Sequence, residues 1–484
     1  MKSSIANDAL KLTTSKIITM IISMITAMLL SRFRTLEEYG TYSQLLLVVN
    51  IVTTIFMLGL PNSINFFLAR AESDEEKEKF ISTYYTLNTL LSFITGLVLV
   101  AATPLIAQYF KNELIKSFWY VLAVYPWTKI IIASIGNILV VCKKVSSLML
   151  FTILNSLFLL FAIIVVQILG LSFAAYMAIF VTGEAVFAII VYIIVGNLTG
   201  KIRIYVEKDL VKSILKFSLP IGLATTVGTL SIQLDKLVIG YFFNTEQLAI
   251  YTNAAREMPV TIISSSLTAV IMPELVKLLK NNKNDEAITL WKHAITLSYI
   301  CICFFATGLF VFASEFISLL YSDKYLSGVA VFRVFNVVLL LRCTYFGMIL
   351  NSIGKTKFIF YSSIASLGLN VILSYLFYLM FGFIGPAIAT FISIAAVNMC
   401  QLIVSSKSIS ISFINIFPWK FLAIITMINI FFGVSFTLVK EVIQLETFTG
   451  EIMESIVLGI AWGIIYFLIM LKTIKTKWKV LKSY

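Results

Sequence analysis

Long apolar runs separated by short polar turns dominate this chain almost from end to end. A run of about 20 apolar residues forms a helix long enough to cross a bilayer, and fourteen such runs follow one another here. The pattern therefore predicts fourteen membrane-spanning helices. Their approximate bounds are residues 12–32, 40–69, 80–103, 114–142, 146–169, 172–196, 213–243, 247–279, 290–313, 328–353, 358–381, 383–406, 416–440 and 451–471.

Composition supports an all-α polytopic membrane protein. Hydrophobic residues make up 60% of the 484 residues and charged residues only 13%, against about a quarter charged in soluble domains. The longest connection, residues 197–212, is far shorter than the ~50 residues of a minimal domain, which excludes an appended soluble enzyme domain. Several predicted spans are long and contain proline, which predicts tilts, kinks or extensions at the membrane surface. These prolines are Pro61, Pro126, Pro220, Pro259 and Pro273.

Lys and Arg are unevenly divided between the two sides of the predicted membrane. With the N-terminus inside, the cytoplasmic segments hold 25 of the 37 basic residues and the outer loops hold six. Because basic residues accumulate on the cytoplasmic side, we expect both termini in the cytoplasm. The same distribution explains the net charge of +13 as a signal for topology and anionic lipid, so the charge does not indicate nucleic-acid binding.

An internal repeat relates the two halves of the chain. The stretch SRFRTLEEYGTYS from Ser31 resembles GYFFNTEQLAIYT from Gly240, and GNILVVCKK from Gly136 resembles GMILNSIGK from Gly347. This predicts two six-helix bundles in parallel pseudo-repeat, followed by two added C-terminal helices. Bundles of this kind place a substrate site between the halves and expose it alternately to each side; an ancient duplication without a moving cleft is the alternative. The predicted divisions are residues 1–196, a cytoplasmic linker 197–212, residues 213–406, and residues 407–484 with a basic cytoplasmic tail.

Ionisable residues inside the predicted spans are candidates for function, because each costs several kcal/mol unless it faces protein or water. Lys129 lies midway along the fourth predicted helix and Arg342 midway along the tenth. Two cations that face a shared cavity would neutralise a diphosphate, Arg as a bidentate fork and Lys as a point charge. In the alternative, Lys129 pairs with Glu184 as a buried structural bridge. The intramembrane set is Lys16, Lys129, Glu184, Asp235, Lys236, Arg256, Glu257, Arg333 and Arg342.

Asp235 and Lys236 stand side by side in an otherwise apolar segment. Asp235 and Arg256 lie at matched depth on either side of the turn at Asn244, so we expect them to pair, with a purely structural bridge as the alternative. Neighbouring residues on a helix diverge by about 100°, which leaves Lys236 able to point into a cavity. The chain contains no Ser/His/Asp set and no cluster with metal-ligand spacing, so we expect no catalytic activity and no cofactor.

Three stretches resemble a known family. LSRFRTLEEYGTYSQ, DKLVIGYFFNTEQLAIYTNAAREM and VIMPEL are similar to the Wzx-type polysaccharide, or oligosaccharide, flippases of the MATE and MviN-like (MOP) superfamily, and the likeness covers essentially the whole chain. The resemblance implies a transporter of the bacterial cytoplasmic (inner) membrane that moves undecaprenyl-diphosphate-linked oligosaccharide to the outer leaflet. The polymers served would be O-antigen of lipopolysaccharide, capsule or exopolysaccharide, with membrane lipids and the polysaccharide polymerase machinery as partners.

The resemblance also implies roles for the intramembrane charges. A cationic cavity would hold the diphosphate and glycan, with Lys129, Lys236, Arg256, Arg333 and Arg342 as its cations. Proton or sodium coupling would use the acids Glu184, Asp235 and Glu257.

Four other functions stay open. A peptidoglycan lipid II flippase would carry an arginine-rich first helix, whereas Arg32 and Arg34 lie at its outer end. A MATE-like drug exporter favours acids and aromatics over buried cations. A glycan polymerase or ligase needs a sizeable outer loop, and the largest candidates, near residues 104–116 and 440–454, are short. An accessory lipid scaffold would tolerate replacement of both Lys129 and Arg342.

Overall fold

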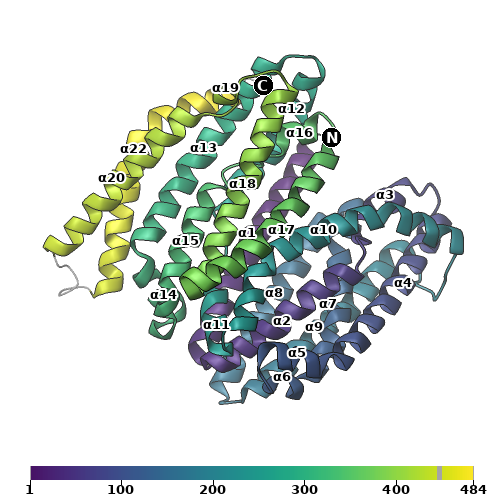
Figure 1. The fold of residues 1–484 in the computed structure, drawn as a ribbon. Coiled ribbons are helices and arrows are strands. Elements are labelled where there is room, and N and C mark those ends of the chain that lie inside the picture. The colour runs from purple at the N-terminus through teal and green to yellow at the C-terminus, as the bar shows by residue number, and fades with distance from the viewer. Residues whose placement is uncertain (1, 444–449, 483–484) are drawn as a thin grey trace. The chain divides into compact units, whose positions relative to one another are not determined.

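The structure of this chain is a computed structural model that describes residues 2–443 and 450–482. Every regular element within those residues is a helix. The chain divides into two compact units, Met1–Ala249 and Ile250–Tyr484, which run from purple to teal and from teal to yellow in Figure 1.

Unit 1 consists of long apolar helices joined by short turns. Helices α4, α7 and α9 pack side by side, α1 packs on α8, and α2 and α3 pack on α10 (Figure 1). Tyr84, Tyr85, Ile131 and Val191 are among the buried side chains of the core. Its helices are α1 (Lys2–Phe33), α2 (Leu36–Phe56), α3 (Pro61–Phe67), η1 (Leu68–Arg70), α4 (Asp74–Ala101), α5 (Thr103–Phe110), α6 (Leu114–Ser117), α7 (Trp119–Val141), α8 (Val145–Ile168), α9 (Phe173–Thr199) and α10 (Lys208–Phe242).

Polar residues fix where several of these helices begin. Thr35 and Glu38 form a reciprocal capping box at the start of α2, with N–H to side-chain oxygen distances of 3.0 and 3.1 Å. Ser73 and Ser172 accept hydrogen bonds from backbone N–H groups in the first turns of α4 and α9. These caps satisfy donors that the helices leave unpaired, and they place the turns where the hydrophobic pattern stops.

The second predicted span is broken into α2 and α3. Leu58 and Gly59 have φ angles of +49° and +71° between the two helices, and Pro61 begins α3. A Cβ on Gly59 would lie 2.5 Å from the backbone nitrogen of Gly222 in α10. The break is therefore built on two glycines, which allow the backbones of two helices to approach where no side chain fits.

Unit 2 is arranged around α13, which packs against α12, α15, α20 and α22 (Figure 1). Trp291 of α13 and Trp462 of α22 are fully buried. The short helix α11 (Thr245–Ala254) contains the division between the units. The other helices are α12 (Thr261–Lys280), α13 (Asn284–Val311), α14 (Ala313–Tyr321), η2 (Asp323–Gly328), α15 (Val329–Leu340), α16 (Met348–Ser352), α17 (Thr356–Phe381), η3 (Gly382–Ile384), α18 (Gly385–Ser408), α19 (Phe413–Ile416), α20 (Trp419–Ile443) and α22 (Glu451–Lys482).

The all-α polytopic class predicted from the sequence is confirmed. Within the described residues, twelve helical stretches are long and apolar enough to cross a membrane. One of them, Thr356–Ser408, contains α17 and α18, which the sequence predicts as separate spans. The predicted span 328–353 is divided between α15 and α16, neither of which reaches the length of a span alone. These two differences account for twelve stretches where fourteen spans are predicted.

The predicted domain boundaries stay predictions. Contacts group α10 with unit 1, whereas the repeat assigns the same segment to the second bundle. A repeat is a relation between sequences, and packing in one structure does not test it. The linker predicted at 197–212 is shorter as a loop than its bounds suggest, because α9 continues to Thr199 and α10 begins at Lys208.

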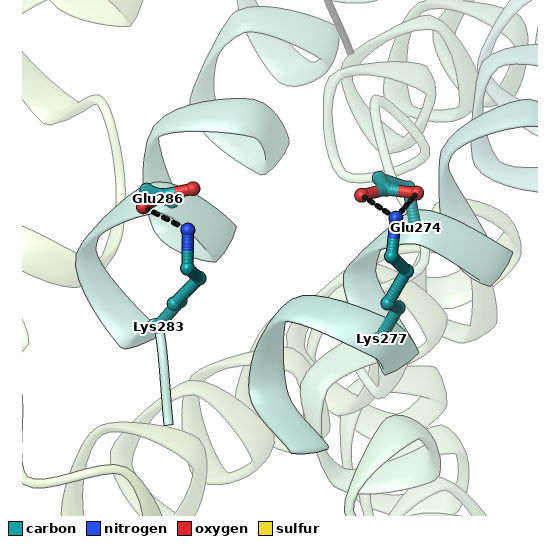
Figure 2. A network of polar contacts seen from close by, with 4 residues as sticks. All are labelled: Glu274, Lys277, Lys283 and Glu286. Carbon is teal, nitrogen blue, oxygen red and sulfur yellow. Dashed lines mark hydrogen bonds and ion pairs between the residues drawn. The ribbon is translucent and has the colours of Figure 1, made fainter. Parts of the chain in front are cut away.

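Two of the basic segments assigned to the cytoplasmic side, at the α12–α13 hairpin and in the tail, are largely helical. In the hairpin between α12 and α13, Lys277 pairs with Glu274 at 3.2 Å and Lys283 pairs with Glu286 at 2.9 Å (Figure 2). The basic tail continues α22 as a helix to Lys482. Part of the predicted outer loop at 440–454, residues 444–449, lies outside the described residues.

Candidate functional site

Lys129 of α7 is one of the predicted cations of unit 1. Its Nζ donates a hydrogen bond of 2.7 Å to Oδ1 of Asn50 on α2. The ring of Tyr125, one turn earlier on α7, lies 6.0 Å from the same nitrogen. An amide and an aromatic ring orient the ammonium group without cancelling its charge. Lys129 is therefore held in place with its positive charge not neutralised by a direct carboxylate contact.

Glu184 of α9 is one of the predicted acids of unit 1. Its side chain is buried, and its Oε1 accepts a hydrogen bond of 3.0 Å from Asn155 on α8. No ion pair joins Glu184 to Lys129 in the described part of the chain. The structural bridge between them, left open by the sequence, does not form as a direct contact. Each group has its own amide partner instead.

Aromatic side chains pack beside this pair of charges. Tyr42 of α2 and Tyr125 of α7 both contact the ring of Phe180 on α9, with centroid separations of 5.9 and 5.0 Å. Tyr176, one turn before Phe180, packs on Tyr42 at 6.2 Å. Tilted and edge-on contacts of this kind hold rings in fixed orientations. These rings join α2, α7 and α9, and one of them, Tyr125, lies near Lys129.

In unit 2, two helix breaks lie against each other. Residues 255–260 separate α11 from α12, and residues 341–347 separate α15 from α16. Glu257 lies in the first break and Arg342 in the second, and their Oε1 and Nη2 atoms are 2.9 Å apart. Breaks in membrane helices free backbone groups and let charged side chains gather, which is where transporters bind substrates and ions.

The space between these two breaks is small. Arg256, Glu257 and Met258 line one side, and residues of α15 with Arg342 line the other. The volume is about 10 Å³, no more than a single water molecule needs. Nε of Arg342 is buried there and has no hydrogen-bond partner among the described residues. One donor of the guanidinium is therefore available to a further acceptor if the breaks separate.

The other predicted site residues have local partners. Arg333 of α15 donates from Nε to the carbonyl of Phe310 on α13 at 3.2 Å and lies over the Phe310 ring. Lys236 donates to Oε1 of Gln233 at 3.0 Å on the same helix, α10. Asp235 is buried, with Oδ1 accepting from the Lys236 backbone nitrogen at 2.8 Å. Arg333 thus connects α15 with α13, whereas the Lys236 side chain is bound to a residue of its own helix, α10.

Several predicted pairings join residues of different units. Asp235 and Lys129 belong to unit 1, whereas Arg256 and Arg342 belong to unit 2. The Asp235–Arg256 pairing stays a prediction. The cavity shared by Lys129 and Arg342 stays a prediction as well. What the structure adds is the Glu257–Arg342 ion pair and the two amide partners, Asn50 and Asn155. The sequence analysis did not select Asn50 and Asn155. The signal that could have identified them is an asparagine within an apolar helix.

Comparison with known proteins agrees with this architecture. A family model described as "Polysaccharide biosynthesis protein" matches residues 29–330. The "Probable low-salt glycan biosynthesis flippase Agl15" of Haloferax volcanii is 22% identical over 228 residues, which cover 45% of this chain and 47% of that protein. The chain thus matches about half the length of this relative.

Two solved structures share the fold. The lipid II flippase MurJ in an inward closed conformation matches with a TM-score of 0.77 at 18% identity, covering 95% of this chain and 99% of that one. The Vibrio cholerae MATE transporter VcmN in its bent form matches with a TM-score of 0.56 at 14% identity, covering 84% of this chain and 98% of that one. Together with the family match, these similarities confirm the resemblance read from the three sequence stretches.

Proposed function

Since this chain belongs to the polysaccharide biosynthesis protein family, we propose that it carries a lipid-linked oligosaccharide across the membrane by alternating access. The substrate class is a glycan repeat unit joined through a diphosphate to a long isoprenoid such as undecaprenol. The direction is from the cytoplasmic to the outer leaflet of a bacterial cytoplasmic membrane, with both termini in the cytoplasm. The polymer served is O-antigen, capsule or another exopolysaccharide, made with a membrane polymerase.

The observation that carries this proposal is Lys129, a cation in an apolar helix whose hydrogen-bond acceptor is a neutral amide. A diphosphate loses its hydration on entering the membrane and needs positive charge in return. Lys129 offers that charge without first breaking an ion pair. Arg342 offers a second cation, whose buried Nε has no partner among the described residues.

The Glu257–Arg342 pair suits a gate. Its Coulomb attraction favours the closed arrangement of the two helix breaks, and a diphosphate would compete with Glu257 for the guanidinium. Substrate binding then separates the breaks by offering Arg342 a bidentate acceptor. Proton or sodium coupling would use the acids Glu257, Glu184 and Asp235.

The experiment is leaflet-specific labelling of the native lipid-linked oligosaccharide in proteoliposomes. A membrane-impermeant lectin reports glycan that reaches the outer leaflet, with and without protein, under an imposed proton or sodium gradient. Protein-dependent exposure supports flipping. Absence of exposure with folded protein and the cognate glycan contradicts it, and gradient-driven efflux of an organic cation in the same vesicles would favour a MATE-like exporter instead.

A further inference from the structure

A groove in unit 1 lies apart from the intramembrane charges described above. It is formed by α4, the C-terminal end of α9 and residues 200–207, which connect α9 to α10 and which we call the strap. Its volume is about 950 Å³, within the range of pockets that hold whole small ligands. The proposed function gives this groove no role.

The strap is fastened along α4 by specific bonds. The backbone nitrogen of Arg203 donates to Oγ of Ser82 at 3.1 Å, and that of Tyr205 donates to Oγ1 of Thr86 at 3.2 Å. The guanidinium of Arg203 also pairs with Glu78 at 3.2 Å. An extended segment with no regular structure thus has a defined position, which makes the groove beneath it a built feature of the fold.

The two ends of the groove differ in chemistry. At the strap end lie Lys201 and Arg203, both exposed, and Lys201 has no hydrogen-bond or ion-pair partner in the described part of the chain. Toward the middle of α4 the lining becomes apolar, with Leu90 54% and Phe93 64% exposed. Between the two ends, the hydroxyl groups of Thr89 and Tyr192 bond to each other at 2.6 Å.

We infer that this groove binds an anionic phospholipid, with the phosphate head group at Lys201 and Arg203 and an acyl chain along Leu90 and Phe93. In the orientation proposed above, the strap lies at the cytoplasmic surface, where the leaflet carries negative charge. A basic end followed by an apolar channel is complementary to one lipid molecule, and the groove is long enough because Tyr85 to Phe93 rise about 12 Å along α4. The bound lipid would join the strap to α4 and α9.

Glu78 limits the affinity of this site. Its carboxylate pairs with Arg203, so a phosphate must displace it or share the guanidinium. Lys201 is then the cation that the head group reaches first. Removing the negative charge at position 78 is therefore expected to strengthen lipid binding, a direction that a merely structural role of the Arg203–Glu78 pair does not predict.

The test measures phosphatidylglycerol binding to the purified full chain by native mass spectrometry, with phosphatidylcholine and inorganic phosphate as reference ligands. Each cation near an anionic head group is worth roughly a factor of five, so K201A/R203A should weaken phosphatidylglycerol binding roughly tenfold, allowing for the existing pair with Glu78. E78Q should strengthen it. K208A/K212A, which removes two exposed cations from the first turns of α10 outside the groove, should leave it unchanged.

Several results would overturn the inference. Equal losses in K201A/R203A and K208A/K212A would mean attraction to the basic surface in general. Unchanged phosphatidylglycerol binding in K201A/R203A, or equal binding of phosphatidylcholine, would contradict a head-group site at Lys201 and Arg203. Binding of inorganic phosphate without binding of phosphatidylglycerol would contradict a lipid as the ligand. Thermal unfolding in phosphatidylcholine identifies any variant that fails to fold. The assay involves no oligosaccharide, so its outcome is independent of the flipping experiment.

Discussion

Lys129 shows how a charge is kept usable inside apolar helices. Asn50 accepts its hydrogen bond at 2.7 Å, and Tyr125 lies beside the ammonium group. A carboxylate at that distance would have bound the charge more strongly and competed with a phosphate group. A neutral partner orients the side chain and leaves its charge for the substrate.

Replacing Lys129 by Ala should lower the flipping rate roughly 10- to 100-fold, the value of a hydrogen bond to a charged group of about 1.5–3 kcal/mol. Membrane insertion should not change. The lectin assay in proteoliposomes measures the rate. Lys116→Ala is the matched control, because Lys116 is half exposed and forms a local ion pair with Glu113, the residue that precedes α6. Normal flipping by Lys129→Ala would remove the diphosphate role from this residue.

Arg342 should depend on its shape as well as on its charge. Arg342→Gln removes the cation and should reduce the flipping rate by a similar 10- to 100-fold. Arg342→Lys keeps the charge but loses the bidentate fork, so its flipping rate should lie between those of the unchanged chain and Arg342→Gln. Glu257→Gln breaks the ion pair at 2.9 Å and leaves the guanidinium intact. If Glu257→Gln abolished transport as completely as Arg342→Gln, the pair would be a structural element and not a substrate gate.

At this scale the sequence shows which side chains in the apolar runs are charged, but it does not show which residues those side chains contact; their roles in function stay predictions. Charged residues in apolar runs are visible in a list of letters, and Lys129, Glu184 and Arg342 are all found on or between the expected helices. Their partners depend on how each helix is rotated, which a nearly uniform apolar pattern does not encode. Asn50 and Asn155 were therefore missed, and Glu257 was not linked to Arg342.

Helix breaks are the distinctive elements of this fold. Two of the three follow from proline: Pro61 begins α3, and Pro259 lies in the gap between α11 and α12. Pro126, Pro220 and Pro273 lie inside continuous helices, so proline alone does not decide. The third break, residues 341–347, contains no proline. Arg342 of this break meets Glu257 of the second break.

The close approach of α10 to the first break predicts a sharp difference between two glycines of α10. A Cβ on Gly222 would lie 2.4 Å from the carbonyl carbon of Leu58, whereas one on Gly228 would meet nothing within 4 Å. Gly222→Ala should destabilise the protein by about 1–3 kcal/mol, because backbone must move. Gly228→Ala should be neutral or stabilising by up to about 1 kcal/mol, because Ala favours helix.

Thermal unfolding in detergent compares the two variants. Both add one methyl group to the same helix, so differences in expression or detergent binding cancel to a large degree. If both variants unfold at the temperature of the unchanged chain, the contact between α10 and the α2–α3 break is not needed for stability. A lower unfolding temperature in Gly228→Ala alone would mean that the face of α10 that carries Gly228, and not the face that carries Gly222, is the tightly packed one.

For the molecule as a whole, hydropathy predicted the all-helical membrane architecture, because a bilayer imposes one length on every span. The all-helical class follows from that regularity, whereas the family was indicated by the resemblance of three sequence stretches and is shown by the family match. The predicted domain boundaries stay predictions: the repeat assigns the α10 segment to the second bundle, and contacts group α10 with unit 1. Packing of one helix against another is decided by local shape, as the Gly59–Gly222 approach shows, and not by the repeat.

Orientation is the property of the whole molecule on which the direction of flipping depends. Single cysteines placed at Lys116 and Lys324, in predicted outer loops, should react with a membrane-impermeant maleimide in intact cells. Single cysteines at Lys280 and Lys357, in predicted cytoplasmic loops, should react only after permeabilisation. The reason is the excess of basic residues in the segments assigned to the cytoplasm, which hold 25 of the 37 Lys and Arg residues.

For this experiment the five native cysteines are replaced first, and retained flipping shows that the cysteine-free protein is folded. The reverse labelling pattern would invert the chain, and the strap with Lys201 would then face the outer leaflet, where a cytoplasmic anionic lipid could not reach it.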